Sequence, residues 1–597
     1  MQWFRSLTVV SLLLTPLAAE AGKERFSLPA GYGTGNKGVE VAQQRRPGSQ
    51  PRYQAPVEID PDAVPPPNPN LPQDFIPIPD RWRLIEAVGV NEKWWDPYNQ
   101  NTLKGDRPIF DDWFVNIVVI SDTIYEPRTF PIPVGIQTTK RAGSLDTFGD
   151  TSTEVFNTNL ITSLQFIKGN TAYKPPDYEI RITPVFNYNK VWADELRVLR
   201  IQPERGDERS DRFIGWQELF LDYHIRNVSD RYDFDSIRVG IQPFSTDFRG
   251  FLFQDNQAGI RLFGTRDNNI FQYNLAYFRK LEKDTNSGLN DLTEDIRDDE
   301  LFIANLYWQD MPVLGFVSQA TVVHNRNREK DNFYFNNNGF LERPASLGDE
   351  RQRDYDVTYF GFNGDGHFGR FNLTVSGYYA FGKDSHNVFS GVEDSDIRAW
   401  FVAAEPSVDF SWIRIRGSLM YASGDDDPFD DREEGFDAPF ENPQFAGADT
   451  SYWIRQTIPL IGGGGVILSG RNAMFPALRS SKEQGQSNFN NPGLTLIGLG
   501  TDIDITPEIR LSTNFNRLDF VDTASLEFLR NQGEIDEGIG WDLSAALIWR
   551  PLFIQNIVFR LSGAVLLPDQ GFKDLYRVND DSEDFFYSVL ANMVLTY

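Results

Sequence analysis

Seven arginines occupy positions where a fixed positive charge could bind a passing anion. Each stands at a polar position of a segment in which apolar and polar residues alternate: Arg181, Arg238, Arg261, Arg414, Arg416, Arg510 and Arg560. A guanidinium group stays charged at physiological pH and matches carboxylates and phosphates in shape. A row of such groups along a pore would concentrate anions there. Alternatively, the arginines brace the wall against acids such as Glu179, Glu218 and Asp222, and both roles can coexist.

An acidic run between the alternating segments suggests a second chemistry. Its carboxylates are Asp425, Asp426, Asp427, Asp430 and Asp431. Carboxylate oxygens are the ligands that Ca²⁺ prefers, so the run is a candidate divalent-cation loop that could bridge to lipopolysaccharide phosphates. The order of acids and glycine that defines an EF-hand is missing, and a solvated loop is the alternative reading.

No residue pattern predicts catalysis. The four histidines are His224, His324, His367 and His386, and none has the spacing of zinc ligands or of a metalloprotease helix. The absence of cysteine excludes disulfides, thiolate metal sites and thiol nucleophiles. The glycines at 462–465 lack the lysine that follows in a phosphate-binding loop. We therefore expect no enzyme activity, no catalytic residues, no cofactor, no structural metal and no nucleic-acid partner.

The elements that carry the arginines are predicted to be β-strands. In the segment Tyr178–Thr183, apolar side chains alternate with Glu179, Arg181 and Thr183, and the same period of two recurs in Leu219–Arg226, Ile413–Tyr421 and Ile557–Val565. This period is that of a strand with two different faces. Counting such segments gives about 18 strands between Trp113 and the end of the chain.

The polar face carries charged residues on strand after strand, and the apolar face is aromatic at its ends. That pattern fits a barrel with a lipid-facing apolar band, aromatic girdles and a wet lumen. An arginine facing lipid at mid-depth costs about 2–4 kcal/mol, so the arginines should face the lumen. We predict an all-β fold, a transmembrane antiparallel β-barrel over 113–597. Its girdles are expected to include Trp541, Trp549, Tyr378 and Tyr379.

The last segment has one uninterrupted apolar face that ends on an aromatic residue. This face comprises Phe585, Tyr587, Val589, Ala591, Met593, Leu595 and Tyr597. The pattern resembles the C-terminal strand signal that the bacterial barrel-assembly machinery recognises in outer-membrane proteins. It predicts an assembly signal, and a last strand that closes the barrel by pairing with the first.

Three segments precede the predicted barrel. Residues 1–21 read as a cleaved bacterial signal peptide, with an apolar stretch from Leu7 to Leu17. Residues 22–79 are rich in proline and form a disordered periplasmic linker. Residues 80–112 combine a short helix expected over 80–89 with an aromatic cluster around Trp94. This segment is a candidate plug for the barrel mouth.

Two stretches resemble a known family. Arg238–Phe244, with Phe248–Gly250 and Gly259–Leu262, resembles a strand-turn-strand unit of outer-membrane barrels of the alginate-export, porin-like type. The acidic stretch Tyr421–Pro428, continuing to Phe440, resembles a loop of the same group. Together they cover about a tenth of the chain. The resemblance implies an 18-stranded barrel that passes anionic polysaccharide, with Arg238 and Arg261 on the pore wall. The long proline-rich extension departs from that family.

Charge and hydropathy agree with this reading. The chain has 597 residues and a formal net charge of −28, with a mean hydropathy of −0.41. Beyond the signal peptide it has no apolar run of the roughly 18 residues that a membrane helix needs. Many acids gather in predicted loops, at 291–300, 425–434 and 579–584. The sequence therefore predicts an acidic rim and a basic lumen.

We therefore expect a bacterial outer-membrane channel that passes an anionic solute. The first hypothesis is export of an exopolysaccharide, with acidic extracellular loops as a gate. The second is a substrate-specific or general diffusion porin for uptake of small molecules. The third is a structural barrel whose tail docks a periplasmic complex. The expected partners are the outer membrane with its lipopolysaccharide, the barrel-assembly machinery and the anionic solute.

Overall fold

The computed structural model describes residues 93–98, 101–129, 151–169, 175–229, 233–461, 471–576 and 585–597, with the single residues Gly89, Pro131, Thr171 and Arg231. The signal peptide, the proline-rich linker, all but the last residue of the helix expected over 80–89, the glycines at 462–465 and the acids at 579–584 lie outside these ranges. The predictions made for them are therefore not tested.

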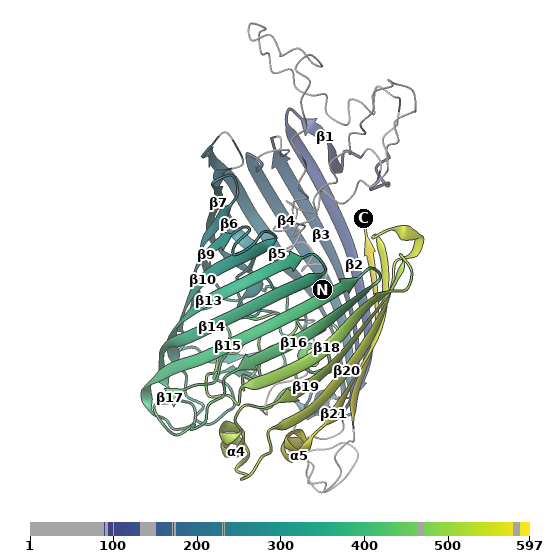
Figure 1. Ribbon diagram of the computed structural model, residues 1–597. Helices are drawn as coiled ribbons and strands as arrows, with labels where there is room; N and C mark the ends of the chain where they lie inside the picture. Colours follow the sequence, from purple (N-terminus) through teal and green to yellow (C-terminus); the bar gives the residue numbers. More distant parts are fainter. Residues whose placement is uncertain are drawn as a thin grey trace.

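Eighteen antiparallel strands form a closed barrel, as predicted (Figure 1). Each strand pairs with its neighbour in the chain, and β22 pairs with β2 to close the ring. The barrel strands are β2 (Trp113–Thr129), β3 (Ser152–Lys168), β4 (Tyr178–Ala193), β5 (Glu208–Asn227), β6 (Phe234–Ser245), β7 (Gln254–Arg266), β8 (Phe271–Arg279), β9 (Asp299–Trp308), β10 (Phe316–Arg328), β13 (Asp354–Phe368), β14 (Phe371–His386), β15 (Glu393–Phe410), β16 (Ile413–Ala422), β18 (Leu494–Asp504), β19 (Ile509–Asp519), β20 (Gly538–Trp549), β21 (Ile557–Pro568) and β22 (Phe586–Thr596).

The remaining elements are short. Two strands extend the barrel sheet, β1 (Lys104–Phe110) beside β2 and β17 (Arg432–Glu433) beside β15. The others lie in connections: β11 (Tyr334–Phe335), β12 (Leu341–Arg343), η1 (Pro203–Arg205), η2 (Pro551–Phe553), α3 (Tyr452–Gln456), α4 (Ala524–Arg530) and α5 (Gln570–Tyr576). Among the described residues, no helix is long and apolar enough to cross a membrane.

The two ends of the barrel differ in the length of their connections. At one end, residues 369–370 and 411–412 are enough to join neighbouring strands, whereas the other end carries long loops such as 329–353 and 423–493. In outer-membrane barrels short turns face the periplasm and long loops face the outside. We call these the short-turn end and the long-loop end. In Figure 1 the long-loop end, with α4 and α5, is at the bottom, and β1 is at the top.

The predicted alternation sets the two faces of the wall. On β5, Leu219, Leu221 and Tyr223 are exposed on the outside, while Phe220 and Asp222 are buried inside. Aromatic side chains ring the short-turn end at Trp113, Tyr178, Tyr223, Phe271, Trp308, Phe371, Phe410, Trp412, Trp549, Phe559 and Tyr597. A second girdle towards the long-loop end includes Tyr125, Tyr379, Trp400, Tyr421, Trp541 and Tyr587.

One girdle prediction is wrong. Tyr379 faces outwards and packs on Trp400, with ring centroids 4.2 Å apart. Tyr378, its neighbour in the chain, is buried inside the barrel, where its hydroxyl donates to Asp247 Oδ2 at 3.0 Å. Successive side chains of a strand point to opposite faces, so two consecutive residues of one strand cannot both face lipid.

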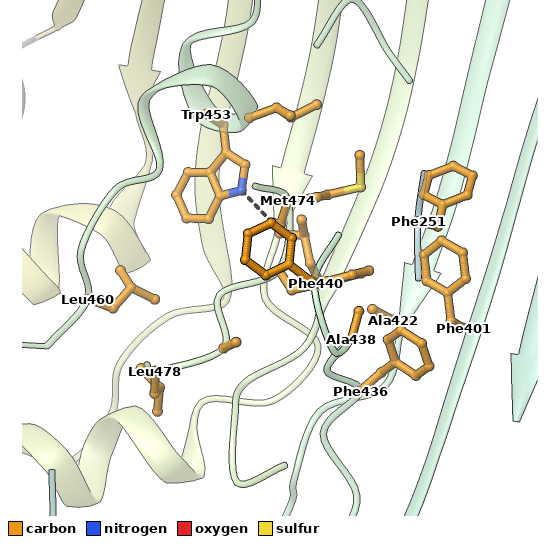
Figure 2. Packing of buried hydrophobic residues seen from close by; sticks show 14 of the residues in the cluster. Phe251, Phe401, Ala422, Phe436, Ala438, Phe440, Trp453, Leu460, Met474 and Leu478 are labelled. Carbon is orange, nitrogen blue, oxygen red and sulfur yellow. Dashed lines mark hydrogen bonds between the residues drawn. The ribbon is translucent and has the colours of Figure 1, made fainter. Parts of the chain in front are cut away.

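The long-loop half of the lumen is packed with inward-turned loops, where a wet lumen was expected. Phe436 of the loop 423–493 packs on the wall residue Phe401 at 5.2 Å between ring centroids, and Phe251 of the loop 246–253 packs on Phe401 at 4.9 Å. Figure 2 shows this cluster, in which Trp453 Nε1 donates to the carbonyl of Met474 at 3.0 Å. The interior therefore contains an apolar core as well as polar wall.

Other loops turn inwards and interlock with this core. Leu289, between β8 and β9, crosses the lumen to the closure of the barrel, where it packs with Ile120, Ile161, Val185 and Val594. Arg297 of the same loop forms an ion pair with Glu329 of the loop 329–353 at 2.9 Å. Arg297 Nη1 also donates to the carbonyl of Glu483 at 3.3 Å. Three loops that are far apart in sequence therefore hold one another in place.

The described part of the candidate plug lies at the short-turn rim. β1 pairs with the first residues of β2, and Asn101 Nδ2 donates to the hydroxyl of the last residue, Tyr597, at 3.1 Å. Residues 101–112 thus extend the wall next to β22 and do not fill the mouth.

The apolar face predicted for the last strand is confirmed, since Tyr587, Val589 and Leu595 are exposed on the outside.

Candidate functional site in the lumen

A cavity of about 920 Å³ lies in the short-turn half of the lumen. Its wall residues come from strand ends near the short turns, on β13 to β16 and β18 to β21, and its roof is the segment 444–450 of the long loop. We call this cavity the vestibule. Its charged lining consists of Arg249, Arg414, Arg416, Arg510 and Arg560, together with Asp310, Asp365, Glu405, Asp449 and Asp502. The formal charges of the five arginines and five carboxylates cancel.

Two vestibule arginines form ion pairs with carboxylates of the wall and are still exposed to the cavity. Arg414 Nε and Nη2 donate to the carboxylate of Asp409 at 2.5 and 3.0 Å. Arg510 Nε and Nη2 donate to Asp504 at 2.6 and 3.1 Å. The two arginine side chains are nevertheless 46% and 43% exposed. Exposed pairs of this kind contribute at most about 1 kcal/mol, so a solute anion can compete for these guanidinium groups.

Arg416 and Arg560 are held more deeply in the wall. Arg416 Nε lies 3.1 Å from Asp502 Oδ2, and its Nη2 donates to Asn514 Oδ1 at 2.9 Å. Arg560 Nη1 lies 3.8 Å from Asp449 Oδ2 of the roof. Their side chains are 12% and 9% exposed. Arg416 therefore braces the wall, and Arg560 ties the roof to the wall.

The roof of the vestibule is fixed to two neighbouring parts of the inner wall. Glu405 of β15 accepts from the backbone N–H of Ala446 at 3.2 Å and from Arg249 Nη2 at 2.8 Å. Further along the same wall, Asn516 Nδ2 of β19 donates to the carbonyl of Ala446 at 3.0 Å. The segment 444–450 is therefore fixed inside the lumen against the part of the wall from β15 to β19, where it occupies part of the passage.

The other three predicted arginines form a separate cluster on β4 to β7. Arg181 Nη2 lies 2.5 Å from Glu179 Oε1, and Arg238 Nη2 lies 2.7 Å from Asp222 Oδ2. Both side chains are about one-tenth exposed. Arg261 Nε donates to Asn274 Oδ1 at 2.7 Å, and its guanidinium lies over the Phe263 ring at 4.6 Å.

All seven predicted arginines thus lie on the inner face, but in two groups. Four line the vestibule, and Arg181, Arg238 and Arg261 belong to the more buried cluster. Arg181 and Arg238 form ion pairs with acids of the wall, which is the bracing role considered for them as the alternative. Acids accompany the arginines on the inner wall, so the predicted division into a basic lumen and an acidic rim does not describe the vestibule.

The acidic run does not assemble as a cation site. Within the described ranges, no group of three or more histidine, aspartate or glutamate side chains is placed to hold a metal ion. The carboxylates instead accept from nearby backbone: Asp425 from the N–H of Glu434 at 3.4 Å, Asp427 from Phe429 at 3.1 Å, and Asp430 from Arg432 at 2.7 Å. These contacts turn the chain locally, which is why acid density alone was misleading. The remaining two predicted ligands are Asp426 and Asp431, and both are exposed.

Asp425 makes this loop sensitive to pH. Burial, together with the nearby carboxylates of Asp430, Glu434 and Asp426, raises the pKa of its carboxyl to about 8. The unfolded value is about 3.9, so the folded loop favours the neutral acid. The energetic cost of ionising Asp425 is absent below about pH 4, grows as the pH rises, and is complete above about pH 8.

We expect the backbone amides of 424–435 to lose hydrogen-exchange protection as the pH rises from about 4 to about 8. The measurement is exchange mass spectrometry, corrected for the intrinsic pH dependence of exchange. Asp425→Asn should remove the change, because an amide side chain does not titrate. An unchanged pH dependence in the Asn variant would show that another group is responsible.

Two acids that anchor the inward loops were not singled out from the sequence. Asp247 accepts from the backbone N–H groups of Arg249, Phe251 and Leu252 at 2.9 to 3.1 Å. Asp542 of β20 accepts from the N–H groups of Tyr452 and Trp453 at 3.0 Å and from the Ser451 hydroxyl. Asp247 sits in a local turn that the sequence could have indicated. Asp542 binds a segment about ninety residues away, and no local pattern indicates that contact.

Comparisons with known proteins place this chain in no family. No family model matches it, and no curated protein is significantly similar to it. Among solved structures, it is similar to a BenF-like porin from Pseudomonas fluorescens Pf-5, with 8% identity, a TM-score of 0.44, and coverage of 81% of this chain and 98% of that one.

Two further similar structures come from Pseudomonas aeruginosa. OccK9 (OpdG) has 11% identity, a TM-score of 0.44, and coverage of 81% of this chain and 98% of that one. OccK2 (OpdF) in complex with glucuronate has 11% identity, a TM-score of 0.40, and coverage of 81% and 96%. At this level of likeness, the fold and the function rest on the barrel and vestibule themselves. The alginate-export resemblance stays confined to the two sequence stretches that carry it.

Proposed function

We propose that the protein is an outer-membrane channel for the uptake of small carboxylate-bearing solutes. The observation that supports this most directly is the vestibule, a cavity of about 920 Å³ with two half-exposed arginines on its wall. A closed barrel with an apolar outer band is the architecture of an outer-membrane protein. The inward-turned loops favour this uptake function over polysaccharide export, because the segment 444–450 lies inside the lumen, bound to β15 and β19, and the N–H of Gln444 donates to the carbonyl of Arg249 of the loop 246–253 at 2.7 Å.

The charge-balanced lining suits passage better than tight binding. A solute carboxylate that reaches Arg414 or Arg510 replaces the wall carboxylate, Asp409 or Asp504, as the partner of that arginine. The displaced wall carboxylate stays close by and re-forms the ion pair when the solute leaves. Conduction requires a site that attracts the solute but releases it again. An arginine that already forms an ion pair with a carboxylate of the wall meets both conditions. The buried pairs around Arg181 and Arg238 keep the wall rigid while this exchange takes place.

Solute size provides the test. We expect proteoliposomes that contain the full barrel to swell in an iso-osmotic salt of a small carboxylic acid or a monomeric uronate. They should not swell in a solution of oligo-uronates of ten or more sugars, because the roof narrows the path. Swelling in the neutral sugar of matched mass should be slower than in the uronate. Equal swelling with the long oligo-uronate would contradict the proposal and favour polysaccharide export.

A further inference from the structure

The segment ahead of the barrel is attached to the outer side of the barrel closure. The backbone of Tyr597 pairs with Val119 of β2 through two hydrogen bonds of 2.8 and 3.0 Å. Paired residues share a face, and Leu595, two residues before Tyr597, is exposed on the outside. The Tyr597 hydroxyl donates to the carbonyl of Trp94 and accepts from Asn101 Nδ2 at 3.1 Å. Trp94 and Asn101 are therefore fixed beside a lipid-facing side chain.

The β1–β2 hairpin points its aromatic end to the same outer face. Trp113 pairs with Lys168, Lys168 with Tyr178, and Tyr178 with Tyr223, so these four side chains share one face across β2 to β5. Tyr178 and Tyr223 are exposed, which identifies this face as the outer one. Phe110 is the direct partner of Trp113, and their rings lie 6.0 Å apart. Phe110 therefore continues the short-turn girdle.

Four aromatic side chains in this region are more than half exposed. Trp94, Trp95, Tyr98 and Phe110 are 66%, 60%, 57% and 57% exposed. These values match that of Leu499, an outward residue in the middle of β18, which is 57% exposed. Tryptophan and tyrosine favour the headgroup level of a bilayer, where the ring is partly dehydrated and its polar group stays wet.

We propose that Trp94, Trp95, Tyr98 and Phe110 form a membrane-binding patch that sits in the headgroup region of the periplasmic leaflet. The patch adjoins the short-turn girdle at Tyr597 and Trp113, so its occupant is the lipid that already surrounds the girdle. It covers the place where β2 and β22 close the barrel. The Tyr597 hydroxyl binds the carbonyl of Trp94 and the side chain of Asn101, which keeps Trp94 at the level of the girdle.

Site-directed spin labelling tests this placement directly. The chain has no cysteine, so Trp95→Cys and Phe110→Cys each give a single labelling site in the full protein. Two calibrating variants are Leu499→Cys, facing lipid, and Asp331→Cys, exposed in a long loop. Each variant is reconstituted in phospholipid nanodiscs, and collision of the nitroxide with oxygen and with a water-soluble nickel complex is measured.

The expected result is a higher ratio of oxygen to nickel accessibility at Trp95 and Phe110 than at Asp331. Labels at both sites with the same ratio as the Asp331 label would overturn the proposal. The aromatic side chains would then face the periplasm, as a surface that docks another protein would require. The accessibility ratio reports the depth of one label in the membrane. It therefore does not depend on whether the substitution changes transport.

Discussion

Removal of the long loop from the lumen is expected to raise the single-channel conductance several-fold. The residues 437–487 would be replaced by a four-residue glycine-serine linker. Its ends can be joined because the N–H of Gly435 donates to the carbonyl of Phe489 at 2.8 Å. The barrel should still close, since its strands are held by backbone hydrogen bonds that do not involve this loop. The vestibule would then lose its roof at 444–450.

A single substitution tests the same mechanism with less change. Asp542→Asn replaces the carboxylate that accepts from Ser451, Tyr452 and Trp453 by an amide with one accepting oxygen. We expect frequent transitions to a higher conductance level in planar bilayers, because the start of α3 loses its anchor on β20. Asp331→Asn, an exposed acid in another long loop, is the matched control and should behave like the wild type. Wild-type conductance in both the deletion and Asp542→Asn would show that the loop does not limit the passage.

The strands of the barrel wall could be predicted from the sequence, whereas the inward-turned loops that fill part of the lumen could not. Alternation of period two identifies strands and tells which side chains share a face, which is why Arg181 and Arg510 were placed on the inner side. The pairs Asp409–Arg414 and Asp504–Arg510 are also within reach of sequence reasoning, because each joins direct partners across a tight turn. Such contacts are short in sequence and are fixed by strand register alone.

The inward-turned loops depend on contacts that sequence spacing does not carry. Phe436 and Phe440 lie in stretches rich in polar residues, and only the packed structure shows that they join the cluster of Phe251 and Phe401. The pairing of Arg416 with Asp502 joins residues 86 apart in the chain. The sequence therefore located the arginines on the lumen side but overestimated how much of their charge is left uncompensated.

Removal of two positive charges from the vestibule should make the channel cation-selective. In Arg414→Ala/Arg416→Ala, two positive charges are lost from a lining whose charges otherwise cancel, which leaves a net charge of −2. Asp409 and Asp502 also lose their arginine partners, and keep the neutral donors Asn372 and Ser512. A fixed charge of this sign in a confined pore attracts cations and repels anions. Reversal potentials in a salt gradient should therefore shift towards the cation equilibrium potential, by more at low than at high ionic strength.

Two further variants test whether the vestibule itself sets the selectivity: one removes negative charge beside the vestibule arginines, and the other removes an arginine on the outer face of the barrel. Asp409→Asn/Asp504→Asn releases Arg414 and Arg510 from their carboxylates and should make the channel more anion-selective. Arg398→Ala removes an arginine that pairs with Asp396 on the outer side of β15 and should leave the reversal potential unchanged. If the lumen and outer-face variants shift the potential equally, only net protein charge matters. If none of them does, ions do not pass the exposed arginines, and the path through the barrel lies along the buried cluster on β4 to β7.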